Sequence, residues 1–148
     1  MRPSLLNFLS FTGFALMVAG ILLLYFNGGL FSLSPVVICA QVFALVLMIW
    51  ARATFGGRSF HATARPTQGG LVTRGPYRYL RHPIYASALL LAWAGALGNL
   101  SFTNIGFGLL TFAGAMTRIL CEETLVKVQY PEYAEYAKKT KRLLPFLF

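Results

Sequence analysis

Two short clusters of ionisable residues mark the places where apolar stretches of this chain begin and end. Arg81-His82-Pro83-Ile84-Tyr85 opens one apolar stretch, and Glu122-Glu123 closes the next. A histidine and a pair of carboxylates can bind charged groups or move protons. Ionisable side chains at the ends of membrane segments are costly, and they generally mark functional sites. We therefore expect the two clusters to form one site, although a lone interfacial histidine is more often just a solvated polar residue.

The composition indicates an integral membrane protein. Of 148 residues, 57% are hydrophobic and only 11% are charged, which is too apolar for a soluble domain of this size. The net charge of +9 would suggest nucleic-acid binding in a soluble protein, but the basic residues lie almost wholly outside the apolar stretches. Membrane topology accounts for them, because positive residues stay on the cytoplasmic side. We expect the lipid bilayer as a partner, no nucleic acid and, with only Cys39 and Cys121, no metal site.

Four apolar stretches are long enough to cross a bilayer, which takes roughly 20 residues within a usual range of about 17 to 25. They cover residues 5–26, 30–51, 84–100 and 105–121. With both termini in the cytoplasm, every charged residue falls on the cytoplasmic side. The sequence therefore predicts an all-α, multi-pass membrane protein of one domain over residues 1–148. A cytoplasmic loop would cover residues 52–83 and a cytoplasmic tail residues 122–148.

Local spacing suggests how the second cluster is used. Arg118 and Glu122 are four residues apart and share a helix face, while Glu123 can pair with Lys127 on a neighbouring face. One pair would point inward, and the other would serve as an interfacial strut. On spacing alone, an arginine that snorkels to the interface explains Arg118 as well as a functional role does.

The tail predicts a short interfacial helix, and the third and fourth spans predict close helix packing. Pro131 can open the tail helix, which would lie along the cytoplasmic surface. Its two faces would be formed by Tyr133, Tyr136, Ala137 and Thr140 and, opposite them, by Lys138, Lys139 and Lys141. Small residues recur in the spans at Ala88, Ala92, Gly95, Ala96, Gly106, Gly108, Ala113, Gly114 and Ala115. Such faces let membrane helices approach closely.

Taken in order, several motifs carry a resemblance to a known family. They are the run from Leu71 to Tyr85 (LVTRGPYRYLRHPIY), the spacing Arg118-x-x-x-Glu122-Glu123, and in the tail Tyr130-Pro131-x-Tyr133-x-x-Tyr136 and Arg142-Leu143-Leu144-Pro145. This combination resembles the membrane methyltransferases related to isoprenylcysteine carboxyl methyltransferase and the phospholipid N-methyltransferases. The resemblance covers the chain from about Leu71 to its end.

The resemblance implies S-adenosylmethionine as the cofactor and a lipophilic methyl acceptor at the cytoplasmic membrane face. It places Leu71, Val72, Tyr77, His82, Pro83, Ile84, Tyr85 and Glu122 around the cofactor, and Arg118 on the acceptor side. Together with Glu123, Arg118 and Glu122 are the predicted catalytic residues. Aromatic faces suit a sulfonium, a carboxylate suits an ammonium, and a histidine suits a carboxylate. Carboxylate O-methylation and lipid amine N-methylation both remain open.

Two other functions fit parts of the sequence. Membrane sterol and steroid reductases, which bind NADPH, share a related C-terminal half with a Pro-x-Tyr element. They typically continue with Gly-Glu soon after the tyrosine, whereas Tyr85 is followed by Ala86-Ser87-Ala88. A small non-enzymatic membrane scaffold would explain the spans and the arginines but not the ordered motifs. Methyl transfer is therefore the favoured prediction.

Overall fold

The computed structural model describes residues 3–56 and 70–144, and these residues form helices and no β-strand. The helices are α1 (Pro3–Phe26), α2 (Pro35–Phe55), the short 3₁₀ helix η2 (Gly75–Arg78), α3 (Pro83–Gly98), α4 (Phe102–Gln129) and α5 (Tyr133–Lys139). The predicted all-α fold class is confirmed.

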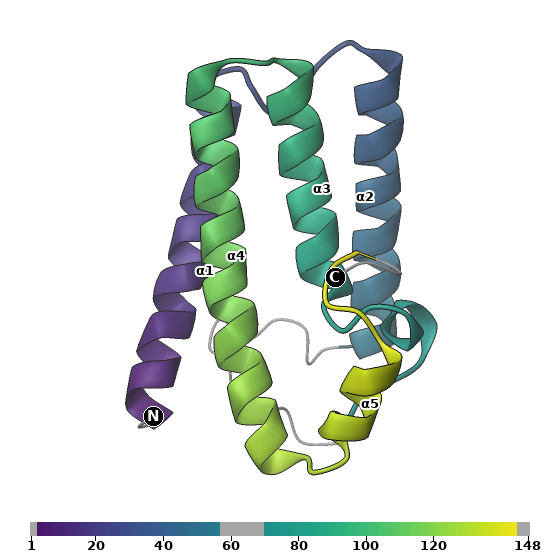
Figure 1. The fold of residues 1–148 in the computed structure, drawn as a ribbon. Helices are drawn as coiled ribbons and strands as arrows, with labels where there is room; N and C mark the ends of the chain where they lie inside the picture. Colours follow the sequence, from purple (N-terminus) through teal and green to yellow (C-terminus); the bar gives the residue numbers. More distant parts are fainter. Residues whose placement is uncertain (1–2, 57–69, 145–148) are drawn as a thin grey trace.

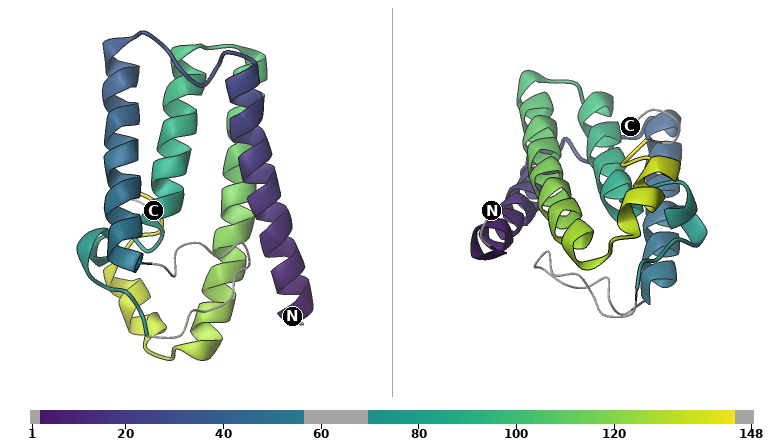
Figure 2. Two further views of the ribbon diagram at one scale, coloured as in Figure 1. Left: turned by 180° about the vertical axis from the view of Figure 1, so that it is seen from behind. Right: turned by 60° about the horizontal axis from the view of Figure 1, so that its bottom comes forward.

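The four long helices stand side by side in a bundle (Figure 1). α1 packs along α4, α2 packs along α3, and α3 also contacts α4. The N-terminus, η2 and α5 lie at one end of the bundle, as the rear and tilted views also show (Figure 2). We call this the charged end. The opposite or far end is formed by residues 27–34 and 99–101, which include no charged residue.

The lengths of the helices agree with a multi-pass membrane protein. α1, α2 and α4 are long and apolar enough to cross a membrane. α3 is also apolar but has 16 residues, which at 1.5 Å per residue gives about 24 Å and falls short of the hydrocarbon core. Because α3 packs against both α2 and α4, much of its surface is covered by protein. The prediction of about four apolar helices is therefore confirmed.

The largest differences from the predicted spans are at the start of α2 and at the end of α4. α2 begins at Pro35 rather than at residue 30, because the chain turns through Gly28, whose φ of 68° favours glycine. Pro35 then occupies the first turn, where its missing N–H leaves no helical bond unmade. α4 continues to Gln129, past the predicted end at residue 121. Glu122 and Glu123 of this stretch have partners inside the protein, so the helix continues through them.

α1 and α4 approach each other closely through glycines. A Cβ added at Gly13 would lie 2.8 Å from the carbonyl oxygen of Gly114, and a Cβ added at Gly114 would lie 2.6 Å from that of Gly13. Either contact is closer than a real Cβ allows, so only glycine fits. The predicted close packing of the fourth span is thus explained at Gly114. Gly106 has no such role, because a Cβ added there would meet no atom within 4 Å.

Amide side chains join the connections at the far end. Asn27 donates a hydrogen bond to the side-chain oxygen of Asn104 at 2.8 Å, and Asn104 donates to the backbone oxygen of Asn99 at 2.6 Å. Gln41 of α2 donates to the backbone oxygen of Leu30 at 2.6 Å. Buried polar groups are costly unless they are paired, and these bonds pair them. The four long helices are therefore linked at this end.

The tail forms the predicted short helix, α5, with the predicted faces. Tyr133 and Thr140 are buried, whereas Lys138 and Lys139 are exposed. After α5 the chain turns back into the bundle, where Leu143 joins a core of apolar residues. The other buried members of that core are Met17, Leu89, Ala115 and Ile119. The tail is therefore anchored to α1, α3 and α4.

The glycine contact between α1 and α4 predicts a position-dependent loss of stability. Gly114→Val should lower the free energy of unfolding by about 1–3 kcal/mol, the usual cost of overpacking. Gly106→Val is the matched control, since it makes the same substitution in the same helix where nothing lies within 4 Å. Thermal unfolding of both variants in one detergent measures the difference. Equal losses would mean that helix propensity, and not the contact, is responsible.

Candidate active site

The segment that leads into α3 lies beside the end of the tail. The backbone N–H of Arg81 donates to the carbonyl oxygen of Lys141 at 2.7 Å, and that of His82 donates to Arg142 at 3.1 Å. The N–H of Lys141 in turn donates to the carbonyl oxygen of Tyr79 at 3.1 Å. These bonds form a short parallel pairing of residues far apart in the sequence. His82, the N-cap residue of α3, is therefore held in place by its own backbone hydrogen bond and by that of Arg81.

Glu123 holds this pairing to α4. Its carboxylate lies 3.1 Å from Arg81 Nε, 3.1 Å from Arg142 Nη2 and 3.3 Å from His82 Nε2. The side chain is only 4% exposed, so its charge depends on these partners. The hydrogen bonds raise the pKa of the Arg142 guanidinium. Glu123 thus points into the protein rather than acting as the predicted interfacial strut with Lys127.

Arg81 also fixes the end of α5. One terminal nitrogen of its guanidinium donates to the carbonyl oxygen of Ala137 at 2.8 Å and to that of Thr140. Carbonyl groups in the last turn of a helix lack helical partners, and a cation is well suited to them. Burial and the nearby Glu123 carboxylate raise the pKa of the Tyr133 phenol well above its usual range. The end of α5 is therefore held by the same arginine that contacts Glu123.

Glu122 takes part in a second chain of hydrogen bonds. Arg118 Nε donates to the hydroxyl oxygen of Tyr85, and that hydroxyl donates to Oε1 of Glu122. Arg118 Nε also lies 3.0 Å from the same carboxylate oxygen, which confirms the predicted pairing four residues apart. His82 Nδ1 is 3.9 Å from the other carboxylate oxygen. The site thus brings together residues of α4 with the first turn of α3.

Arg118 is enclosed by protein. Its guanidinium carbon lies 4.9 Å from the centre of the Phe14 ring and 5.9 Å from that of Tyr85. Its side chain is 5% exposed, so the alternative of an arginine that snorkels to the interface is wrong. Phe14 belongs to α1, and nothing in the sequence around it distinguishes it from other apolar residues of the first span.

Tyr77 lies between α2 and α5. Its ring is buried and lies 5.4 Å from the ring of Phe55, while its backbone oxygen accepts a hydrogen bond from the Tyr136 hydroxyl at 2.7 Å. Burial raises the pKa of the Tyr77 phenol, and the neighbouring Tyr136 and Glu122 raise it further. Tyr77 thus contacts α2 through Phe55 and α5 through Tyr136.

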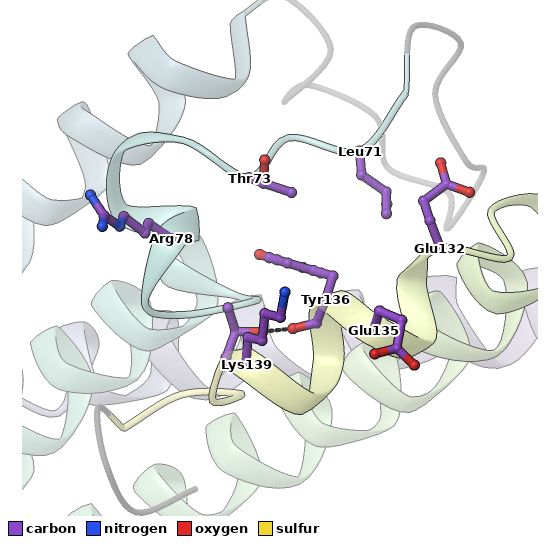
Figure 3. A pocket seen from close by; sticks show the side chains of 8 residues that line it. Leu71, Thr73, Arg78, Glu132, Glu135, Tyr136 and Lys139 are labelled. Carbon is purple, nitrogen blue, oxygen red and sulfur yellow. Dashed lines mark hydrogen bonds between the residues drawn. The ribbon is translucent and has the colours of Figure 1, made fainter.

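An open pocket of about 650 Å³ lies between η2 and α5 (Figure 3). It is lined by Leu71, Thr73, Arg78, Glu132, Glu135, Tyr136, Lys139 and Thr140. Of the predicted ligand-binding residues only Leu71 lines it, and half-buried Val72 follows directly in the chain. The sequence assigns no ligand to Tyr136, whose hydroxyl donates a hydrogen bond to the backbone oxygen of Tyr77 beside this pocket. Pro83 and Ile84 lie in the first turn of α3, one buried and one half-buried.

Comparison with known proteins gives one family and one curated relative. The family model described as phospholipid methyltransferase matches residues 31–133. The cobalt-zinc-cadmium resistance protein CzcN of Cupriavidus metallidurans is 30% identical over 117 residues, covering 70% of this chain and 45% of that protein. The chain thus spans about half the length of the curated relative it matches. No solved structure matches it. Among residues 3–56 and 70–144, no group of three or more His, Cys, Asp or Glu could hold a metal ion.

The buried ion pairs of Glu123 predict a large loss of stability on substitution. Glu123→Ala leaves two arginines without their buried partner, and breaking such a pair costs about 3–5 kcal/mol. Lys138→Ala removes the exposed pair between Lys138 and Glu135 and should change stability little. Chemical unfolding measures both variants, and trypsin cleavage in the tail reports whether it is released. Similar behaviour of the two variants would show that Glu123 does not hold the tail.

Proposed function

The chain belongs to the phospholipid methyltransferase family, and from this premise we propose that it transfers a methyl group from S-adenosylmethionine to a lipophilic acceptor. The observation that supports this best is the chain of contacts from Arg118 through Tyr85 to Glu122. It brings the two ionisable clusters together within one bundle of apolar helices. Sterol reduction and a scaffold role have no comparable support.

The residues around Glu122 suit the proposed cofactor. A carboxylate is available for its ammonium, tyrosine faces for its sulfonium, and His82 for its carboxylate. We propose that Tyr77, His82, Pro83, Ile84, Tyr85 and Glu122 hold it, and that Leu71 and Val72 border its path through the pocket beside α5. When bound, S-adenosylmethionine supplies an electrophilic methyl group. The protein contributes alignment and the exclusion of water, which dominate a direct displacement.

The two glutamates have separate roles in this proposal. Glu123 is surrounded by Arg81, Arg142 and His82, and it positions the segment before α3 rather than meeting the acceptor. Glu122 is 22% exposed and faces Tyr85 and Arg118. We therefore assign Glu122, and not Glu123, to the binding of the cofactor and the acceptor. For an amine acceptor it is also the group best placed to accept a proton.

The acceptor side lies toward Arg118 and the bilayer. α1 and α2 expose many large apolar side chains, among them Phe8, Phe11, Val42 and Phe43, as lipid-facing helices do. We propose that the chain is one domain with the charged end and both termini in the cytoplasm. A lipophilic acceptor would then arrive from the bilayer and the cofactor from the cytosol.

Calorimetry with S-adenosylhomocysteine tests the cofactor site. The purified protein should bind this product, and Glu122→Ala and His82→Ala should each weaken binding about tenfold or more, as loss of a charge-assisted hydrogen bond does. Lys127→Ala, an exposed change in the same helix, is the control. No binding by the unaltered protein, or undiminished binding by both site variants, would rule out the proposal.

Arg118→Ala separates the acceptor side from the cofactor side. Turnover should be lost, because the acceptor loses its orienting group. Binding of S-adenosylhomocysteine should remain, because Glu122 and His82 are still present. Isotopic methyl transfer to membrane lipids measures turnover, and calorimetry measures binding. If binding is lost as well, Arg118 belongs to the cofactor site.

A further inference from the structure

Basic and aromatic side chains are exposed together where the tail meets the segment before α3. The backbone N–H of Lys141 donates to the carbonyl oxygen of Tyr79 at 3.1 Å, so these two exposed residues are neighbours. Arg78 and Lys139, both also exposed, line the pocket beside them (Figure 3). We call these four residues, Arg78, Tyr79, Lys139 and Lys141, the basic strip.

The basic strip lies close to the level at which the bundle becomes apolar. The backbone N–H of His82 donates to the carbonyl oxygen of Arg142, and α3 begins at the next residue, Pro83. Leu143 is already buried in the apolar core of the bundle. Leu144 follows it directly but is 55% exposed, so it faces the surroundings of the bundle. In a membrane, the surroundings at this level are the headgroups and the first part of the acyl chains.

The carboxylates of the chain leave the basic strip positively charged. Glu122 and Glu123 pair with bases inside the bundle. Glu135 pairs with Lys138. Only Glu132 is left, and it lines the pocket without an ion pair. Within residues 3–56 and 70–144, none of the three bases of the strip forms an ion pair. Their charge is therefore available to an anionic partner.

The combination of side chains favours an anionic lipid surface over a soluble polyanion. Lysine and arginine beside a membrane helix are attracted to negatively charged headgroups. A tyrosine ring is well suited to the headgroup level, and a leucine to the acyl chains below it. A soluble polyanion would satisfy the bases but would leave Leu144 in water. A lipid satisfies both.

We propose that the basic strip and Leu144 bind anionic phospholipids of the leaflet at the charged end of the bundle. The phosphate of the lipid pairs with Arg78 and Lys141, and its acyl chains contact Leu144. This surface is separate from the contacts among Arg118, Tyr85 and Glu122, and its binding does not depend on the methyltransferase function. Bound lipid would hold the tail, and with it the pairing before α3, against the membrane.

Electron paramagnetic resonance of spin-labelled lipids tests the proposal. The full chain is reconstituted into phosphatidylcholine bilayers that contain a trace of labelled phosphatidylglycerol or, with the same acyl chains, labelled phosphatidylcholine. Phosphatidylglycerol has neither an amine nor a carboxylate, so it is not an acceptor of the proposed reaction. The unaltered protein should immobilise phosphatidylglycerol preferentially. The preference should disappear at about 1 M salt, where charges are screened within about 3 Å.

Two variants of the strip and one matched control locate the binding surface. Arg78→Gln and Lys141→Gln should each lower the preference by up to about fivefold, the contribution of one base at a membrane surface. Lys127→Gln makes the same change at an exposed lysine of α4. Lys127 lies five residues beyond Glu122, about 7 Å farther along the helix from the apolar level. This control should change the preference little.

Equal immobilisation of the two labelled lipids by the unaltered protein would overturn the proposal. So would equal losses in Lys127→Gln and Lys141→Gln, because net charge alone would then explain the preference. Soluble polyphosphate that binds the protein in the absence of any lipid preference would assign the strip to a soluble partner instead. The number of immobilised phosphatidylcholine molecules per protein reports whether each variant is inserted. If a variant fails that check, a preference that survives high salt in the unaltered protein contradicts the proposal.

Discussion

The buried carboxylate of Glu123 draws three separate parts of the chain to one point. Arg81 and His82 precede α3, Arg142 follows α5, and Glu123 itself belongs to α4. A charge withdrawn from water is tolerated only with close partners of opposite sign, so the carboxylate and its partners must stay together. The position of His82, the start of α3 and the attachment of the tail all depend on this requirement.

Adjacent glutamates on one helix do different work because successive side chains point about 100° apart. Glu123 faces the tail and the segment before α3, whereas Glu122 faces Tyr85 and Arg118. The more buried residue stabilises the structure. The less buried one, Glu122, is the residue we propose for ligand binding, and its buried neighbour keeps the helix in place.

Much of the fold could be predicted because its causes are local. Apolar length indicated the membrane helices, Pro83 indicated the start of α3, and the spacing of Tyr133 and Thr140 indicated the buried face of α5. The roles of Glu122 and Glu123 could not be separated, since only the return of the tail decides which of them is enclosed. The bridge between Leu80 and Lys141 could not be predicted, because neither residue lies in a strand pattern. Phe14 gave no signal either, because its contact with Arg118 is made to a helix distant in sequence.

The amide network at the far end has a mechanical consequence. Asn27, Asn104 and Asn99 join the turns between helices, and the backbone of Gly29 sits too close to Asn104 for any side chain to intervene. The bundle is therefore held together at its far end. Helices held together at one end can separate only at the other, so any sideways opening toward the lipid must widen from the half that contains Arg118.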